Sequence, residues 1–220
     1  MVLAPLQFTR CFPTVRAAMG HVGYTGPMRP LPWPVVLASA SPRRRELLQT
    51  VIPDFTVVPA DLDEDALTSD DPFQTAQRLS REKALAVAEL HPDSLVIGGD
   101  TVVALPIESG WMQLTKPTSE PDALRILQTL AERTHHVITG VCLRWPAGLT
   151  SFTENSLVTF RRLTDQEIKD YIATGEPMDK AGAYGLQGGA KGFVERIEGS
   201  VTNVIGLPME RLEEFLQSLR

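Results

Sequence analysis

Residues 95–105 read LVIGGDTVVAL, and this stretch decides the fold class. An almost uninterrupted apolar run rich in valine is typical of a strand that is buried on both faces. Its only charged residue is Asp100, which follows two glycines. A buried carboxylate is costly unless it is paired or bound to a metal, and glycines let a ligand approach the backbone. The run therefore predicts a central strand with a functional carboxylate, or else a structural ion pair at the strand's end.

Strands and helices alternate on both sides of this run. Ser41 and Pro42 supply an N-cap and a proline at the first helical position, and residues 164–167 form a capping box. Residues 180–201 read as strand and loop. The expected helices cover 41–48, 71–90, 119–133, 164–172 and 209–219, and the other expected strands cover 35–38, 55–58, 136–143 and 156–161. Interleaved elements of both kinds predict one α/β domain over residues 35–220, built on a mixed twisted sheet with flanking helices.

Charge and composition exclude several classes of function. The 220 residues carry 21 Lys and Arg against 27 Asp and Glu, a formal charge of −6. Nonspecific binding to a nucleic-acid backbone is therefore not expected. No apolar run approaches the roughly 18 residues that a membrane-spanning helix needs, and the two cysteines lack the spacing of metal ligands. We expect a cytoplasmic protein with no nucleic-acid or membrane partner.

Residues 1–34 differ in composition from the rest of the chain. They are rich in proline and hold no acidic residue, the first one being Glu46. We interpret them as an N-terminal extension outside the fold, either disordered or preceding a translation start at Met19 or Met28. Their arginines would suit a transit peptide, but the absence of serine disfavours that alternative.

The turn from strand 35–38 into the next helix carries Ser39, Ser41 and the arginines at 43–45. Cations normally avoid a helix N-terminus, because its N–H groups and its dipole favour anions. An anion that neutralises Arg43 and Arg44 explains the pattern, and a polyphosphate offers acceptors that match guanidinium groups. The alternative is a set of solvated arginines that pair with nearby carboxylates.

Lys83 falls near the middle of the apolar stripe of the expected helix 71–90. Either it snorkels along the edge of the core, or its ammonium group meets a phosphate or a catalytic carboxylate. Asp100 could orient or deprotonate a water or hold Mg²⁺, with a second acid from residues 61–65. Most of that acidic run reads equally well as a solvated loop.

A glycine-rich segment, DKAGAYGLQGG, covers residues 179–189. Its glycines allow turns and close approach of a ligand, and Gln187 offers a donor and an acceptor that suit the edge of a base. The segment is not a P-loop, because the required spacing is absent and Lys191 is followed by glycine. Taken alone, such a pattern can be a simple turn.

With a few shorter segments, these stretches resemble the Maf family of nucleoside triphosphate pyrophosphatases, in order from about Val35 to the end of the chain. The matching segments are LASASPRRRELL at 37–48, REKA at 81–84, GDTVV at 99–103, KP at 116–117, TGV at 139–141, DKAGAYGLQG at 179–188 and GLP at 206–208. The resemblance implies a mixed α/β fold related to that of inosine triphosphatases, with two lobes around a cleft and usually a homodimer.

The resemblance also implies the reaction, which is hydrolysis of the α–β phosphoanhydride bond of a nucleoside triphosphate with a divalent cation, Mg²⁺ or Mn²⁺. Carried over by position, the substrate-binding residues fall on Ser39, Arg43, Arg44 and Gln187. The catalytic residues fall on Asp100, Glu64, Lys83 and Lys116, and the metal ligands on Asp100 and Glu64.

Within the family, the motifs look like the branch that acts on dTTP and UTP, including modified pyrimidine nucleotides, as a house-cleaning activity. The alternatives are the same reaction on CTP or 7-methyl-GTP, and a noncatalytic nucleotide-binding regulator of septation. Acids that face a polyanion argue against a pure binder. Two positions depart from the family pattern: Gly99, where alanine is common, and Val201, where an aromatic residue is frequent.

Overall fold

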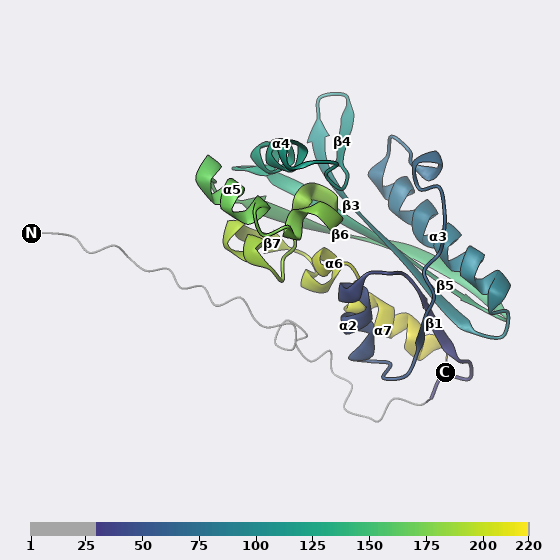
Figure 1. Ribbon diagram of the computed structural model, residues 1–220. Coiled ribbons are helices and arrows are strands. Elements are labelled where there is room, and N and C mark those ends of the chain that lie inside the picture. The colour runs from purple at the N-terminus through teal and green to yellow at the C-terminus, as the bar shows by residue number, and fades with distance from the viewer. Residues whose placement is uncertain (1–29, 220) are drawn as a thin grey trace, which may run out of the picture.

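The computed structural model describes residues 30–219. Within that range, strands form one sheet in the order β2-β1-β3-β5-β6-β7, with β4 paired to β3 (Figure 1). β1 is parallel to β2 and β3, and the other pairs are antiparallel. The strands are β1 (Val35–Ala38), β2 (Thr56–Val57), β3 (Leu95–Ile107), β4 (Gly110–Leu114), β5 (Thr134–Trp145), β6 (Gly148–Phe160) and β7 (Val194–Glu198).

Helices flank this sheet, so the predicted mixed α/β architecture is confirmed. The α-helices are α2 (Pro42–Gln49), α3 (Pro72–Leu90), α4 (Glu120–Leu130), α5 (Asp165–Ile172), α6 (Val201–Ile205) and α7 (Met209–Ser218). Short 3₁₀ segments are η1 (Asp65–Leu67), η2 (Glu176–Asp179), η3 (Ala181–Ala183) and η4 (Gly189–Phe193). None of these helices is long and apolar enough to cross a membrane.

Side chains alternate between the two faces of β3, and this alternation divides the core. On one face, Leu95 and Ile97 belong to an apolar cluster with α2 and α7, whereas Val103 and Leu105 belong to another with α4 and α5. Figure 1 shows α4 and α5 at one end of the long strands and α2 and α7 toward the other. The opposite face of the sheet is covered by α3. The two clusters therefore lie along one face of the same sheet, one beside α2 and α7 and the other beside α4 and α5.

The edge of β3 is open at its centre. β1 pairs with β3 only as far as Gly98, and β4 pairs with it only from Val103 onward. In the described chain, residues 99–102 therefore have a strand neighbour on one side only, which is β5. Successive side chains point to opposite faces of a strand, yet at this gap both Asp100 and Thr101 border the same cavity.

Two glycines let α3 pack directly on the sheet. A Cβ atom at Gly98 would collide with the backbone of Ser80, and one at Gly140 would collide with the backbone of Ala76. Gly140 is also the residue of β5 that pairs with Asp100 of β3. The lack of side chains at these positions therefore brings α3 close to the strand that carries Asp100.

The structure departs from the sequence expectations in four places. β4 was not expected. β6 begins at Gly148 rather than at 156, because its first half, which is mostly half-exposed and polar, forms a hairpin with β5. α6 begins at Val201, the last residue of the segment 180–201 that was expected to be strand and loop. At the N-terminus, Leu31 and Trp33 pack against the α2 and α7 cluster. The rest of the expected extension, residues 1–29, lies outside the described residues.

Candidate active site

The turn from β1 into α2 forms one wall of the site. Ser39 follows the buried strand β1, and the Ser41 hydroxyl caps α2 by accepting the backbone N–H of Arg44 at 3.4 Å. Pro42 occupies the first turn, as the sequence predicts. This cap fixes where α2 begins, and it places Arg43 and Arg44 in the first turn beside the open edge of β3.

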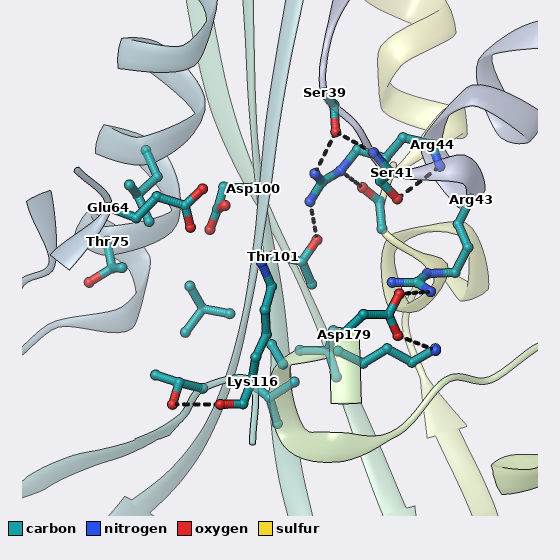
Figure 2. A pocket seen from close by; sticks show the side chains of 18 of the residues that line it. Ser39, Ser41, Arg43, Arg44, Glu64, Thr75, Asp100, Thr101, Lys116 and Asp179 are labelled. Carbon is teal, nitrogen blue, oxygen red and sulfur yellow. Dashed lines mark hydrogen bonds and ion pairs between the residues drawn. The ribbon is translucent and has the colours of Figure 1, made fainter. Parts of the chain in front are cut away.

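Arg44 is held by three protein acceptors, and Figure 2 labels two of their residues, Ser39 and Thr101. Its Nε donates to the Gly206 carbonyl at 2.8 Å, Nη1 to the Ser39 hydroxyl at 3.0 Å and Nη2 to the Thr101 hydroxyl at 2.9 Å. Burial lowers the pKa of Arg44, an effect that the negative charge of Asp100 opposes. An arginine has five N–H bonds, so two stay available for an anion in the cavity that Arg44 lines.

Arg43 is held loosely in comparison. Its Nη1 lies 3.8 Å from a carboxylate oxygen of Asp179, and its side chain is 25% exposed. Lys180 also contacts Asp179, at 2.6 Å. Burial tends to raise the pKa of Asp179, but the hydrogen bond and charge of Lys180 and the charge of Arg43 outweigh it and hold that pKa below its ordinary value.

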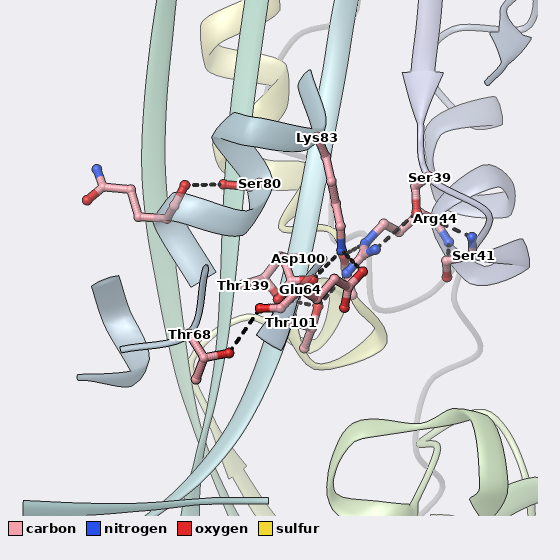
Figure 3. Close-up of polar contacts among 12 residues, drawn as sticks. Ser39, Ser41, Arg44, Glu64, Thr68, Ser80, Lys83, Asp100, Thr101 and Thr139 are labelled. Atoms are coloured by element: carbon pink, nitrogen blue, oxygen red, sulfur yellow. Dashed lines mark hydrogen bonds and ion pairs between the residues drawn. The ribbon is translucent and has the colours of Figure 1, made fainter. Parts of the chain in front are cut away.

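Lys83 lies between two carboxylates (Figure 3). Its Nζ is 2.7 Å from Asp100 Oδ1 and 2.7 Å from Glu64 Oε1. The Lys83 and Asp100 side chains are 10% and 12% exposed, so Lys83 points inward rather than snorkelling to solvent. Asp100 is ion-paired, but at the open centre of β3 rather than at the strand's end.

Glu64 is the one acid of the 61–65 run that contacts Lys83 in the described chain. Burial tends to raise the pKa of Glu64, but the hydrogen bond and charge of Lys83, with the charges of Lys116 and Arg44, outweigh it. The pKa of Glu64 therefore lies below its ordinary value. This carboxyl group is ionised at neutral pH.

The donor set fits a hard divalent cation. Two carboxylates converge on one point, the Lys83 ammonium, and each uses only one of its oxygens in the contacts described above. Carboxylate oxygens suit Mg²⁺ and Mn²⁺, which fill their other positions with water and phosphate oxygens. A group of three or more His, Cys, Asp or Glu side chains arranged for a metal does not occur among the described residues. A cation here would accordingly depend on a phosphate ligand.

One cavity of about 970 Å³ collects all eight residues singled out from the sequence. Its size lies within the range of small-molecule sites. Lys116 lines it from the segment after β4, and its ammonium has no ion-pair partner in the described chain. Gln187 lines it from the connection between η3 and η4. The predicted site residues therefore share one cavity, although they come from distant parts of the sequence.

Sequence reasoning missed three participants in the site. Thr101 was part of a quoted motif but received no role, and Asp179 was named only as the start of the glycine-rich segment. The third is the backbone carbonyl of Gly206, whose residue has a φ of +128° that glycine adopts readily. The GLP motif at 206–208 was the available signal, but every residue has a backbone carbonyl, so the residue type does not reveal which carbonyl is an acceptor.

Comparison with known proteins gives consistent matches. Residues 34–219 match the family model described as Maf-like protein. A protein of Koribacter versatilis named dTTP/UTP pyrophosphatase is 48% identical over 83% of this chain and 93% of its own length. A protein of the same name from Geobacillus sp. is 48% identical over 80% of this chain and 93% of its own length. One from Aquifex aeolicus is 42% identical over 84% of this chain and 95% of its own length. Among solved structures, the Staphylococcus aureus Ham1 protein aligns over 84% of this chain and 99% of its own, at 15% identity and a TM-score of 0.47.

Proposed function

The chain belongs to the Maf-like protein family, and we propose that it is a dTTP/UTP pyrophosphatase, which hydrolyses these nucleotides to the monophosphate and pyrophosphate. The observation that carries the proposal is the Lys83 ammonium at 2.7 Å from both Glu64 and Asp100, in the cavity that also holds Arg44. Acids and cations that meet in this way suit a reaction in which water attacks beside a polyphosphate.

The two carboxylates supply the base. Asp100 or Glu64 accepts a proton from a water whose oxygen attacks the α-phosphorus, and the bond from that phosphorus to the α–β bridging oxygen breaks. Lys83 holds both carboxylates in place, and its charge keeps Glu64 ionised. The proton is thus taken up at the cavity wall while the electron pair leaves with pyrophosphate.

The cationic residues stabilise the leaving group. Negative charge grows on pyrophosphate as the bond breaks, and cations placed beforehand around it lower the barrier. Arg44 is fixed by its three acceptors, whereas Arg43 and Lys116 are free to adjust to the phosphates. We assign Ser39 to the same phosphate site, and Gln187 to the base edge at the η3–η4 connection.

We propose that Asp100 and Glu64 also hold the divalent cation, Mg²⁺ or Mn²⁺, which would polarise the phosphate oxygens when bound. Removing divalent cations with EDTA should stop the release of pyrophosphate, and adding Mg²⁺ should restore it. Turnover that persists in EDTA would contradict this assignment.

A homodimer, on the strength of the family resemblance, and a cytoplasmic location, on the strength of composition and cysteine spacing, complete the proposal. Light scattering of the purified chain should give a mass twice that of one chain, and a monomeric mass would contradict the dimer. No nucleic-acid partner is expected, so oligonucleotide binding with a steep salt dependence would contradict the assignment.

The experiment that tests the function compares dTTP, UTP, CTP, GTP and 7-methyl-GTP in the presence of Mg²⁺, with separate detection of pyrophosphate and inorganic phosphate. We expect pyrophosphate from dTTP and UTP, with kcat/KM at least about tenfold above that for the other nucleotides. Preferential release from CTP or 7-methyl-GTP would overturn the substrate assignment. Inorganic phosphate alone would overturn the reaction, and nucleotide binding without release would indicate a regulator.

A further inference from the structure

A chain of three hydrogen bonds leads from Arg44 into the core (Figure 3). Figure 3 labels its first three members: Arg44 Nη2 donates to Thr101 Oγ1 at 2.9 Å, and the hydroxyls of Thr101 and Thr139 lie 3.0 Å apart. Thr139 Oγ1 lies 3.1 Å from the Asn203 carbonyl oxygen. Thr139 is a fully buried residue of β5 and does not line the cavity. Within the described residues, its side-chain hydrogen bond to Thr101 links it to a residue that lines the cavity.

Only one arrangement of protons serves all three contacts. The Asn203 carbonyl can only accept, so the Thr139 hydroxyl must donate to it. Its single proton is then used, and Thr139 must accept from Thr101. The Thr101 proton is used in turn, so the Thr101 oxygen turns an acceptor lone pair to the Arg44 guanidinium. The carbonyl at the far end thus fixes the orientation of the hydroxyl at the near end.

The far end of this chain is itself anchored. The Asn203 side-chain amide donates to the Val137 carbonyl and to the Ser156 hydroxyl, both at 2.9 Å. These contacts tie α6 to β5 and β6. The Asn203 carbonyl lies in the last turns of α6, where carbonyls lack partners within the helix. Thr139 therefore connects a rigid anchor to the hydroxyl that orients Arg44.

We propose that Thr139 is a positioning residue for phosphate binding, which acts through Thr101 on Arg44. The inference rests on the proposed function, in which Arg44 binds the phosphates. Without the Thr139 hydroxyl, the Thr101 proton has no acceptor in the core. The Thr101 hydroxyl then turns freely, and Arg44 loses the fixed acceptor for Nη2.

A comparison of four proteins that differ at position 139 separates the effect of the hydroxyl group from the effect of the methyl group. Threonine has both, Thr139→Ser keeps the hydroxyl, Thr139→Val keeps the methyl in the same volume, and Thr139→Ala has neither. The measurement is the affinity for inorganic pyrophosphate with Mg²⁺, determined by calorimetry. Loss of the hydroxyl should weaken this affinity about tenfold, both when the Val variant is compared with wild type and when the Ala variant is compared with the Ser variant. Loss of the methyl alone should change this affinity less than threefold, although it lowers thermal stability.

A second comparison identifies the route. In a Thr101→Val background, Thr139→Val should change pyrophosphate affinity by less than twofold, because the connection to Arg44 is already cut. Two results would overturn the proposal. One is a loss of pyrophosphate affinity that depends on the methyl group and not on the hydroxyl, and the other is a full tenfold loss from Thr139→Val in the Thr101→Val background. Failure of the wild-type protein to release pyrophosphate from dTTP would instead contradict the proposed function, and the binding order of the four proteins would still test the role of Thr139.

Discussion

Arg43 and Arg44 are neighbours in the sequence, but the protein surrounds them differently. The Arg44 guanidinium donates to three acceptors, which lie in the turn after β1, in β3 and at the residue after α6. Arg43 has one ion pair, at 3.8 Å, with an exposed Asp179. A guanidinium spreads five N–H donors over three nitrogens, so it can keep three acceptors and still face a ligand, whereas an ammonium group has three donors on one nitrogen. Geometry therefore matters at Arg44, whereas charge alone suffices for most of what Arg43 does.

This difference predicts the outcome of two matched substitutions. Arg44→Lys should lower kcat/KM for dTTP about 100-fold, because the ammonium cannot keep all three acceptors and a phosphate ligand. Arg43→Lys should lower it less than about tenfold, since it preserves the charge near Asp179. Steady-state kinetics of the two variants would check this. A loss for Arg44→Lys as small as the one expected for Arg43→Lys would show that Arg44 contributes only its charge.

At the scale of elements, the position of α3 determines the contact between Lys83 and Asp100. Lys83 reaches Asp100 because β3 and β5 present glycines to α3 at positions 98 and 140. At Gly140 a side chain would meet the backbone carbonyl of Ala76, which cannot rotate away as a flexible side chain can. Strand composition thus sets the distance between the helix and the carboxylate.

Gly140→Ala should therefore displace α3. We expect a loss of about 1–3 kcal/mol in the free energy of unfolding, as for other overpacked cores, together with a lower kcat as Lys83 moves from Asp100. Gly192→Ala is the matched control, because its added Cβ meets open space, and it should change stability by less than about 0.5 kcal/mol. Urea denaturation measures both. Equal stabilities for the two variants would show that close packing at Gly140 is not required.

At the scale of the whole molecule, the core beside α4 and α5 contains a buried histidine. His135 is fully buried, and its Nε2 lies 2.8 Å from the Tyr184 hydroxyl. Burial lowers the pKa of His135 from 6.5 to about 3. The unfolded chain therefore binds a proton at this residue between about pH 6.5 and pH 3, whereas the folded protein does not. Stability must fall as the pH falls through this window.

Between pH 7 and pH 5, this proton uptake should lower the free energy of unfolding by about 2 kcal/mol. The carboxylates of the protein also respond to acid, so the measurement is the difference between wild type and His135→Gln, which cannot titrate at this position. The change from pH 7 to pH 5 should be about 2 kcal/mol smaller in the variant, whatever its stability at pH 7. The same change in both proteins would mean that His135 is protonated in the folded state.

Much of this architecture could be predicted from local pattern. The run at 95–105 gave β3, and the caps at Ser41 and Thr164 gave α2 and α5, because hydrophobic period and capping act within a few residues. β4 is a short strand with exposed residues, and the first half of β6 is mostly half-exposed and polar, so both were missed, since pairing with β3 and β5 rather than a buried apolar run holds them. Pairing partners are not visible in a local window.

The site, too, has residues that could be predicted from local sequence and residues that could not. Charged side chains in unusual places, such as Asp100 in a buried strand and Lys83 in an apolar stripe, could be found from the sequence because their burial is costly without partners. All eight predicted residues line one cavity. The Gly206 carbonyl and the Thr139 hydroxyl could not be found, because neither is an unusual residue and both act through tertiary hydrogen bonds.

The most direct test of the central claim is the rate of pyrophosphate release from dTTP by Asp100→Asn beside the wild-type protein, with Mg²⁺ present. The substitution keeps the shape of the side chain and removes its charge and basicity. The account predicts a loss of at least about 10³-fold in kcat, in a variant whose circular dichroism matches that of the wild type. A rate within tenfold of the wild-type value would contradict the role of Asp100 and the mechanism built on it.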